Sequence, residues 1–196
     1  MKNNIYRQAE FLLSAHNPSQ FPPDSGAEVA FAGRSNSGKS SVINVITGRR
    51  ALARVSKTPG RTQMINFFTV TDAIRLVDLP GYGYAGVPGS VRQHWARLIT
   101  AYFDGRKSLK GLILVTDIRR LLTAYDEQML AWSLDRQLPV RILLNKTDKL
   151  SYSAARQALT TVAGKIDPQS TTVQLFSALK KSGVDEVCRQ LDEWLV

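Results

Sequence analysis

Residues 33–40 read Gly33-Arg34-Ser35-Asn36-Ser37-Gly38-Lys39-Ser40 and match the phosphate-binding pattern G-x-x-x-x-G-K-S, the P-loop. The apolar run 28–32 before them suits a buried strand, and residues 41–46 after them suit the first turns of a helix. Glycines let such a loop turn its backbone N–H groups inward, where they hold a polyphosphate together with the helix N-terminus. Lys39 is placed to reach the β- and γ-phosphates, and the Ser40 hydroxyl to ligate Mg²⁺. The alternative is a glycine loop that only caps a helix.

A second motif, Asp78-Leu79-Pro80-Gly81, closes the apolar strand around 75–77 and has the form D-x-x-G. An acid at this place, downstream of a P-loop, reaches Mg²⁺ through water, and the Gly81 N–H contacts the γ-phosphate and senses its loss. We therefore expect Lys39 and Gly81 to stabilise the phosphates. No catalytic residue is assigned beyond this phosphate site.

A third motif, Asn145-Lys146-Thr147-Asp148, follows the apolar run 141–144 as N-K-x-D. The Asp148 carboxylate is suited to accept hydrogen bonds from the guanine ring N–H and exocyclic amine, a pair of donors that adenine lacks. The Lys146 stem is expected to lie over the base, and the Asn145 amide to tie this loop to the P-loop. The alternative is an ordinary turn between a strand and a helix.

Two shorter segments complete the expected site. One is Phe176-Ser177-Ala178, in which the Ala178 N–H is expected to meet the guanine oxygen. The other is Gly60-Arg61-Thr62-Gln63-Met64, from a stretch in which a threonine completes Mg²⁺ coordination. Thr58 and Thr62 both compete for that role, and we assign Thr62 because it stands immediately before a predicted strand. The expected metal ligands are Ser40 and Thr62, with Asp78 acting through water.

The pattern of the chain predicts an α/β fold. Predicted strands cover 28–32, 63–71, 74–78, 111–117, 140–145 and 172–177, and predicted helices cover 39–47, 89–105, 124–136, 151–165 and 182–195. This alternation predicts a six-stranded, mostly parallel sheet with one antiparallel edge strand and helices on both faces. Residues 1–26 are expected to be an N-terminal extension packed on the domain 27–196, with 11–14 pairing at a sheet edge or lying across it.

Composition predicts a single cytoplasmic domain. The chain has 196 residues, of which 43% are hydrophobic, and no apolar run approaches the length of a membrane span. Arg7 and Glu10 lie where a signal peptide has an apolar core, and the single Cys188 excludes an internal disulfide framework. We expect a monomer with no membrane contact.

The charge balance points to a further partner. Lys and Arg number 26 against 16 Asp and Glu, which gives a formal net charge of +10. A surface this basic favours an anionic partner beyond one nucleotide, and residues 49–61 carry much of that charge. The alternative is that the charge serves solubility alone.

With these motifs in order, the chain resembles the EngB family of bacterial GTPases, also called YihA or YsxC. The resemblance rests on residues 33–41 (GRSNSGKSS), 56–63 (SKTPGRTQ) and 78–84 (DLPGYGY) and covers nearly the whole chain. Where the family more often has Thr-Lys-x-Asp, this chain has Asn145 in the general GTPase form. The resemblance implies a Ras-like fold, GTP and GDP as ligands, Mg²⁺, a role in assembling the large ribosomal subunit, and a need for normal cell division and septation.

Two residues bear on the rate of hydrolysis. Many GTPases place a glutamine directly after the D-x-x-G glycine to orient the attacking water, whereas this chain has Tyr82, so we expect slow intrinsic hydrolysis. By resemblance to cation-dependent relatives, Asn36 coordinates K⁺ beside the phosphates. Alternatively, Asn36 only hydrogen-bonds the loop backbone.

The sequence leaves three functions open. The first is a slow GTPase switch that binds ribosomal RNA and protein of the large subunit. The second is a GTP-dependent protein-interaction module at the division site, without RNA contact. The third is a metabolic P-loop kinase, against which Asp148 and the D-x-x-G loop argue.

Overall fold

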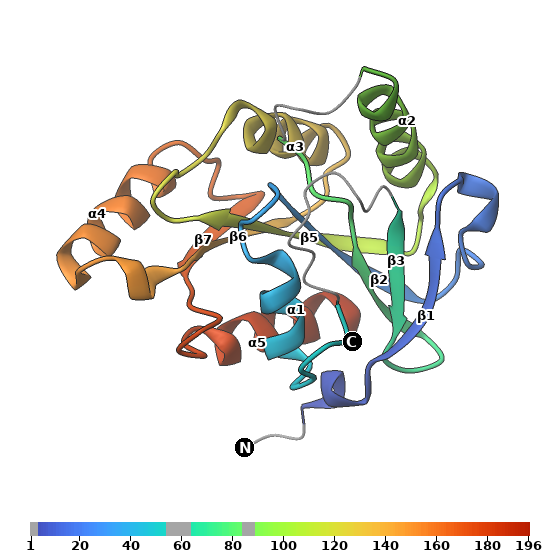
Figure 1. The fold of residues 1–196 in the computed structure, drawn as a ribbon, viewed down its shortest axis with the longest axis horizontal. Coiled ribbons are helices and arrows are strands. Elements are labelled where there is room, and N and C mark those ends of the chain that lie inside the picture. Colours follow the sequence, from blue (N-terminus) through green and yellow to red (C-terminus); the bar gives the residue numbers. More distant parts are fainter. Residues whose placement is uncertain (1–3, 54–63, 84–88) are drawn as a thin grey trace.

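The computed structural model describes residues 4–53, 64–83 and 89–196 as three layers, a central sheet with helices on both of its faces (Figure 1). The strands are β1 (Glu10–Ala15), β2 (Ala27–Gly33), β3 (Ile65–Thr69), β4 (Ile74–Asp78), β5 (Leu109–Asp117), β6 (Val140–Asn145) and β7 (Thr171–Leu175). The α-helices are α1 (Lys39–Ile46), α2 (Gly89–Gly105), α3 (Ala124–Asp135), α4 (Tyr152–Ala163) and α5 (Val184–Leu195). Short 3₁₀ turns cover Ile5–Gln8, Pro18–Gln20 and Thr147–Lys149. No helix in this described part is long and apolar enough to cross a membrane.

The strands of the described chain form one seven-stranded sheet in the order β1-β3-β4-β2-β5-β6-β7. Strands β4, β2, β5, β6 and β7 pair in parallel, whereas β3 is antiparallel to both β4 and β1. The α/β class and the mostly parallel sheet are therefore confirmed.

The predicted count of six strands was one too low. Residues 10–15 form the edge strand β1, so β3, the antiparallel strand, lies second from the edge. The sequence pattern of β1 does not indicate a strand clearly, because only its last residue, Ala15, is buried. A register irregularity between Phe11 and Leu13 also interrupts the alternation of side chains between the two faces of the sheet. The pairing of 11–14 at a sheet edge, one of the two alternatives considered, is correct.

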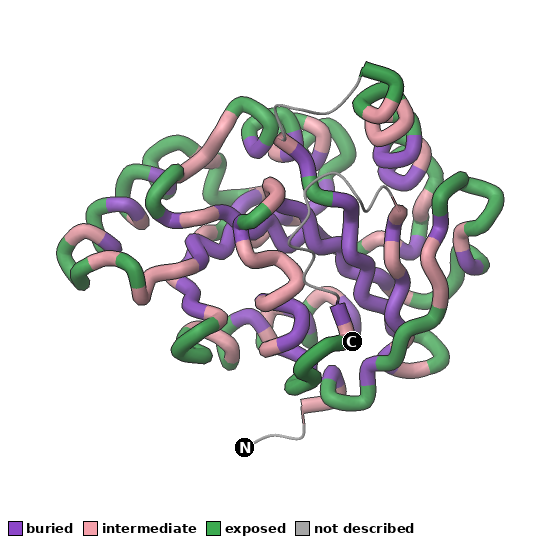
Figure 2. Tube along the Cα trace, in the orientation of Figure 1, coloured by how far each residue is buried: buried purple, intermediate pink, exposed green. Residues whose placement is uncertain are grey.

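Burial explains why the parallel strands are continuous apolar runs. In β5, Leu112 and Leu114 face the core shared with α2, α3 and α4, whereas Ile113 and Val115 face the core shared with α1 and α5. Successive side chains of a strand point to opposite faces, so a strand covered on both sides needs apolar residues throughout. Figure 2 shows this as buried tube along the centre of the sheet.

The N-terminal residues pack on the α1 and α5 side of the sheet. Tyr6 and Ala9 are buried in that core, and the Tyr6 hydroxyl donates a hydrogen bond to Asp192 Oδ1 on α5 at 2.8 Å. The Asn4 side chain donates to the Ile46 carbonyl at the end of α1, at 3.1 Å. These contacts attach the first described residues to two helices.

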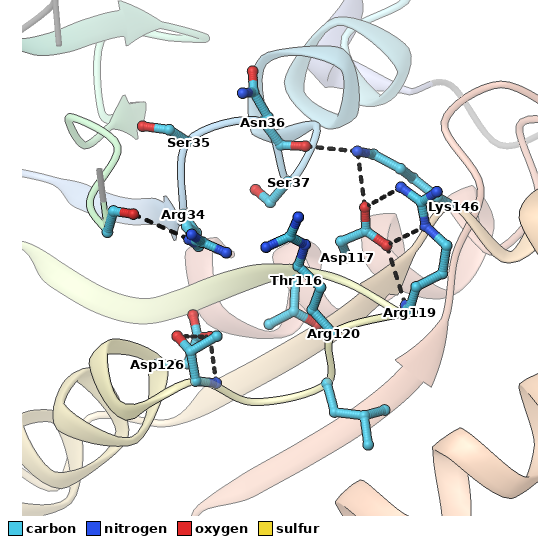
Figure 3. Close-up of a pocket in the computed structure, with 13 residues that line it drawn as sticks. Arg34, Ser35, Asn36, Ser37, Thr116, Asp117, Arg119, Arg120, Asp126 and Lys146 are labelled. Atoms are coloured by element: carbon cyan, nitrogen blue, oxygen red, sulfur yellow. Dashed lines mark hydrogen bonds and ion pairs between the residues drawn. The ribbon is translucent and has the colours of Figure 1, made fainter. Parts of the chain in front are cut away.

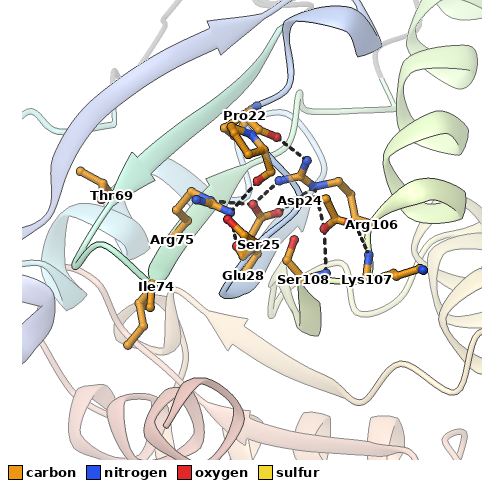
Figure 4. Close-up of polar contacts among 12 residues, drawn as sticks. Pro22, Asp24, Ser25, Glu28, Thr69, Ile74, Arg75, Arg106, Lys107 and Ser108 are labelled. Carbon is orange, nitrogen blue, oxygen red and sulfur yellow. Dashed lines mark hydrogen bonds and ion pairs between the residues drawn. The ribbon is translucent and has the colours of Figure 1, made fainter.

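A buried ionic cluster lies at the amino end of β2 (Figure 4). The fully buried Glu28 carboxylate accepts hydrogen bonds from Arg75 Nε at 2.7 Å and from the Tyr102 hydroxyl at 3.1 Å. Arg106, directly after α2, also pairs with both Glu28 oxygens and donates to the Pro22 carbonyl at 2.7 Å. The cluster thereby connects β2, β4, α2 and the loop before β2.

Candidate nucleotide-binding site

The predicted motifs meet at one edge of the sheet. The P-loop follows β2, the D-x-x-G motif begins at the last residue of β4, and the N-K-x-D motif begins at the last residue of β6. These strands are parallel, so their carboxyl ends lie together, which is where open α/β sheets bind ligands.

The P-loop has the backbone conformation that phosphate binding needs. Gly38 has a φ of +95° and Asn36 a φ of +68°, both in the left-handed region, and α1 begins directly afterwards at Lys39. An added Cβ on Gly33 would lie 2.5 Å from the Val115 carbonyl oxygen, so the loop packs closely against β5. The Lys39 ammonium pairs with Asp78 Oδ1, which brings the P-loop lysine and the D-x-x-G acid into one place.

Asn145 joins the loops expected to bind the base to the P-loop, as predicted. Its side chain is almost fully buried, donates to the Ser37 carbonyl at 2.9 Å, and accepts from the Ala178 N–H at 3.2 Å. The Ala178 N–H, expected to meet the guanine oxygen, thus has Asn145 Oδ1 as its partner here. Thr147 donates through both its N–H and its hydroxyl to the Phe176 carbonyl, which fastens the two base-side loops together.

Asp148 is held as an ionised acceptor. The Ser177 hydroxyl donates to Asp148 Oδ1 at 2.6 Å, and this hydrogen bond lowers the pKa of the Asp148 carboxyl. A carboxylate that stays charged and is fixed by a neighbour suits recognition of two N–H donors on a base.

Lys146 reaches across the site, and it has an acidic partner that sequence reasoning missed (Figure 3). Its ammonium donates to the Asn36 carbonyl at 2.6 Å and to Asp117 Oδ2 at 3.0 Å. Hydrogen bonds from Arg119 and then Lys146 hold the pKa of Asp117 well below its usual range. Asp117 is the last residue of β5 and lies beside the carboxyl ends of β2 and β6. Its position at the end of an apolar strand could have predicted that it belongs to the site.

The D-x-x-G loop is joined to the P-loop and to two helices. The Ser35 N–H donates to the Tyr82 carbonyl at 3.0 Å, and Arg34 Nε donates to the Gly83 carbonyl at 3.2 Å. Trp95 Nε1 on α2 donates to the Pro80 carbonyl at 3.0 Å, so this tryptophan does more than fill the core. These bonds hold the segment against the P-loop and α2.

The Tyr82 side chain lies in the core on the α2 and α3 side of the sheet. Only 5% of it is exposed, and its hydroxyl donates to Asp126 Oδ1 on α3 at 2.6 Å. Burial and the nearby Asp126 charge raise the pKa of Tyr82 well above its usual value, so the phenol stays protonated and acts as a donor. No sequence signal pointed to this partner.

Comparison with known proteins decides the family. The family model described as 50S ribosome-binding GTPase matches residues 28–146. A "Probable GTP-binding protein EngB" of Nitrosococcus oceani is 56% identical over 196 residues, which covers 98% of each chain. The chain belongs to the EngB family. It is therefore a P-loop GTPase, as its motifs predicted, and the kinase alternative is set aside.

Solved structures agree on the fold. A crystal structure of a probable GTP-binding protein engB has a TM-score of 0.71 at 23% identity, covering 86% of this chain and 98% of that one. The NFeoB structure from S. thermophilus, bound to GDP.AlF4⁻ and K⁺, has a TM-score of 0.56 at 26% identity. It covers 86% of this chain and 62% of that one.

The residues present fit the Mg²⁺ that GTPases use. Ser40 at the start of α1 and Asp78 at the end of β4 offer the hard oxygen atoms that Mg²⁺ prefers. Among the described residues no group of three or more His, Cys, Asp or Glu could hold a metal alone.

Part of the expected site lies outside the described residues. Gly60, Arg61, Thr62 and Gln63 fall there, as does the competing Thr58, so the choice between the two threonines stays a prediction. Met64 is described and directly precedes β3.

Substitution of Gly38 tests the P-loop geometry. We expect Gly38→Ala to lower the free energy of unfolding by about 1–3 kcal/mol, because an L-residue is strained at this φ. Its Cβ would also lie 2.4 Å from Asn145 Nδ2 and displace the amide that joins the loops. GDP affinity should fall with it. Urea unfolding and titration with a fluorescent GDP measure both effects.

The matched control is Gly105→Ala. An added Cβ there meets nothing within 4 Å, so stability and GDP affinity should be unchanged or slightly improved. Equal behaviour of the two variants would show that the P-loop does not need its left-handed glycine.

Proposed function

We propose that this GTPase is a slow nucleotide switch that acts in assembly of the large ribosomal subunit, in the cytoplasm and as a monomer. Normal cell division and septation would depend on it. The observation that best supports a switch is the direct backbone link between Ser35 of the P-loop and Tyr82 of the D-x-x-G segment. The ribosomal partner is supported by the description of the matching family model, 50S ribosome-binding GTPase.

In this proposal, residues on both sides of the γ-phosphate respond to its presence. Lys39 would neutralise the phosphates, and Ser40 and Thr62, with Asp78 acting through water, would hold Mg²⁺, which would supply positive charge at the transferring phosphoryl group. The Gly81 N–H donates to the γ-phosphate and loses its acceptor after hydrolysis. Tyr82 and Gly83, which follow Gly81, accept hydrogen bonds from Ser35 and Arg34 of the P-loop. A rearrangement of this segment after hydrolysis would therefore change the surface to which a partner binds.

Slow intrinsic hydrolysis follows from the position of Tyr82. A phenol that is buried and bonded to Asp126 offers no group to orient water, so acceleration must come from elsewhere. We propose that K⁺ contributes, held by Asn36 beside the phosphates. Asn36 is exposed, and no side-chain hydrogen bond of Asn36 occurs within the described residues, where the backbone-bonding alternative would require one.

Replacing Na⁺ by K⁺ at matched ionic strength should therefore raise GTP turnover by about tenfold or more. Asn36→Gly should remove the difference between the ions, since glycine keeps the positive φ without strain and deletes the amide. Steady-state phosphate release measures both proteins in both salts. Equal turnover of the unmodified protein in K⁺ and Na⁺ would show that K⁺ does not accelerate hydrolysis.

The second candidate is a GTP-dependent protein-interaction module at the division site, without RNA contact. Depletion of the protein in growing cells separates the two. If the assembly role is correct, precursors of the large subunit accumulate on sucrose gradients before septation fails. A normal subunit profile in cells that already fail to divide would favour the protein-interaction module.

A further inference from the structure

Lys146 of the N-K-x-D motif has a constrained conformation (Figure 3). Its φ of +70° lies in the left-handed region, which residues with a Cβ adopt rarely and mostly where the surrounding structure enforces it. A Cβ added to Gly38 would lie 3.7 Å from Lys146 Cε, so the stem of this side chain runs beside the P-loop. The ammonium donates to the Asn36 carbonyl at 2.6 Å. Both the backbone and the far end of Lys146 are therefore held in place.

Asp117 is the charged partner of that ammonium. Asp117 Oδ2 lies 3.0 Å from Lys146 Nζ, and the two side chains are only 9% and 28% exposed. Asn36 offers the ammonium a neutral carbonyl, whereas Asp117 offers it a full negative charge in a place that is mostly shielded from water. The ion pair with Asp117 is therefore the stronger of the two restraints on the lysine.

Asp117 is itself held in one orientation. It lies opposite Asn145 in the pairing of β5 with β6, and the Ile118 N–H donates to the Asn145 carbonyl at 2.9 Å. Its Oδ1 accepts from the Arg119 N–H at 3.1 Å and from Arg119 Nε at 2.9 Å, and its Oδ2 accepts from Arg119 Nη2 at 2.7 Å. The carboxylate thus connects the rigid sheet to the lysine.

The ordering of a lysine side chain has a cost in conformational entropy. The lysine stem has several rotatable bonds, and a nucleotide that had to order them on binding would lose affinity. With the ammonium already bound by Asp117 and Asn36, most of that ordering is complete in the free protein. Such preorganisation raises affinity without any further contact to the ligand.

We propose that Asp117 is a positioning residue for the guanine nucleotide, because it holds the Lys146 side chain across the base site before the nucleotide binds. This role rests on the place of Lys146 in the nucleotide site that the N-K-x-D motif predicts. Asp117 acts through the lysine. Its loss should therefore lower nucleotide affinity and leave the rate of hydrolysis of bound GTP unchanged, since Lys39 and Gly81 serve the phosphates from other loops.

The first test is Asp117→Ala in the full chain, titrated with a fluorescent GDP. GDP affinity should fall by about tenfold, mainly through faster dissociation. Asp117→Glu keeps the charge and should recover part of the loss. The KM for GTP should rise with the loss of affinity, because hydrolysis is slow, whereas kcat should stay within about twofold. A fall in kcat with an unchanged KM would overturn the proposal.

A double-mutant cycle with Lys146 shows whether Asp117 acts through that lysine. Lys146→Ala should lower GDP affinity by about tenfold or more, and adding Asp117→Ala to it should lower the affinity no further. If Asp117→Ala has the same effect with and without the lysine, the proposal is wrong. An unchanged GDP affinity in Lys146→Ala would also overturn it, because the lysine would then lie outside the base site. Neither result bears on the ribosomal role.

The matched control is Asp104→Ala, which removes the carboxylate of another ion pair with an arginine, Arg136. Asp104 lies near the end of α2, which leads into the start of β5, whereas Asp117 is at the far end of that strand. Urea unfolding should show a similar, small change for both variants, since Arg119 is 49% exposed and water can solvate it. Only Asp117→Ala should lower GDP affinity, and an equal loss in both variants would contradict the positioning role.

Discussion

The substitution Asp148→Asn is expected to change the base preference of the site from guanine to xanthine. The asparagine oxygen can still accept from the ring N–H, but its NH₂ group would face the exocyclic amine of guanine, and two donors would then oppose each other. Xanthine carries a carbonyl at that position and accepts instead. Because a site built around hydrogen bonds rejects a mismatched partner strongly, GDP affinity should fall by roughly 10³-fold.

Competition against a fluorescent GDP measures this change. Xanthosine diphosphate should compete better than GDP in Asp148→Asn and worse than GDP in the unmodified protein. The fold should survive, since the Ser177 hydroxyl can still donate to the side-chain oxygen. Asp72→Asn, in the exposed turn between β3 and β4, is the matched control and should leave both affinities unchanged. An unchanged preference for GDP in Asp148→Asn would show that another residue reads the base.

The second large effect is on stability rather than binding. Glu28→Ala should lower the free energy of unfolding by about 3–5 kcal/mol, because it leaves Arg75 and Arg106 as buried cations without their carboxylate (Figure 4). For a domain of this size the melting temperature should fall by roughly 10 °C. The Tyr102 hydroxyl would lose its acceptor as well.

Urea unfolding gives this free energy, with Glu10→Ala on the exposed edge strand as the control. The control should change stability by less than about 0.5 kcal/mol. GDP affinity of folded Glu28→Ala protein should stay near normal, since the cluster lies at the amino end of β2 and the P-loop follows its carboxyl end. A loss of stability no greater than in the control would mean that solvent reaches the two arginines.

Local sequence patterns predicted those parts of the fold that have a local cause. The bounds of α2 were predicted as 89–105 and are Gly89–Gly105, and each motif of the described site follows the strand that was expected to carry it. Continuous apolar runs predict strands that are covered on both faces, and the nucleotide-binding motifs predict which loops follow those strands.

What the sequence did not reveal depends on contacts between distant residues. Glu28, Arg75 and Arg106 are separated by dozens of positions, and no spacing rule links them. The same holds for Tyr82 with Asp126 and for Asp117 with Lys146. Strand β1 was considered only as one of two alternatives for a different reason, since its exposed residues carry no apolar alternation and its order comes from pairing with β3.

In the proposed function, the GTP-bound form of this protein docks on the large ribosomal subunit. Co-sedimentation with purified subunits tests it, with GDP, with a non-hydrolysable GTP analogue and without nucleotide, at two salt concentrations. We expect binding to the large subunit only with the analogue, and weaker binding at the higher salt because RNA phosphates would carry much of the contact. Tight guanine-nucleotide binding with no subunit bound in any state would contradict the ribosomal role and direct the search to protein partners.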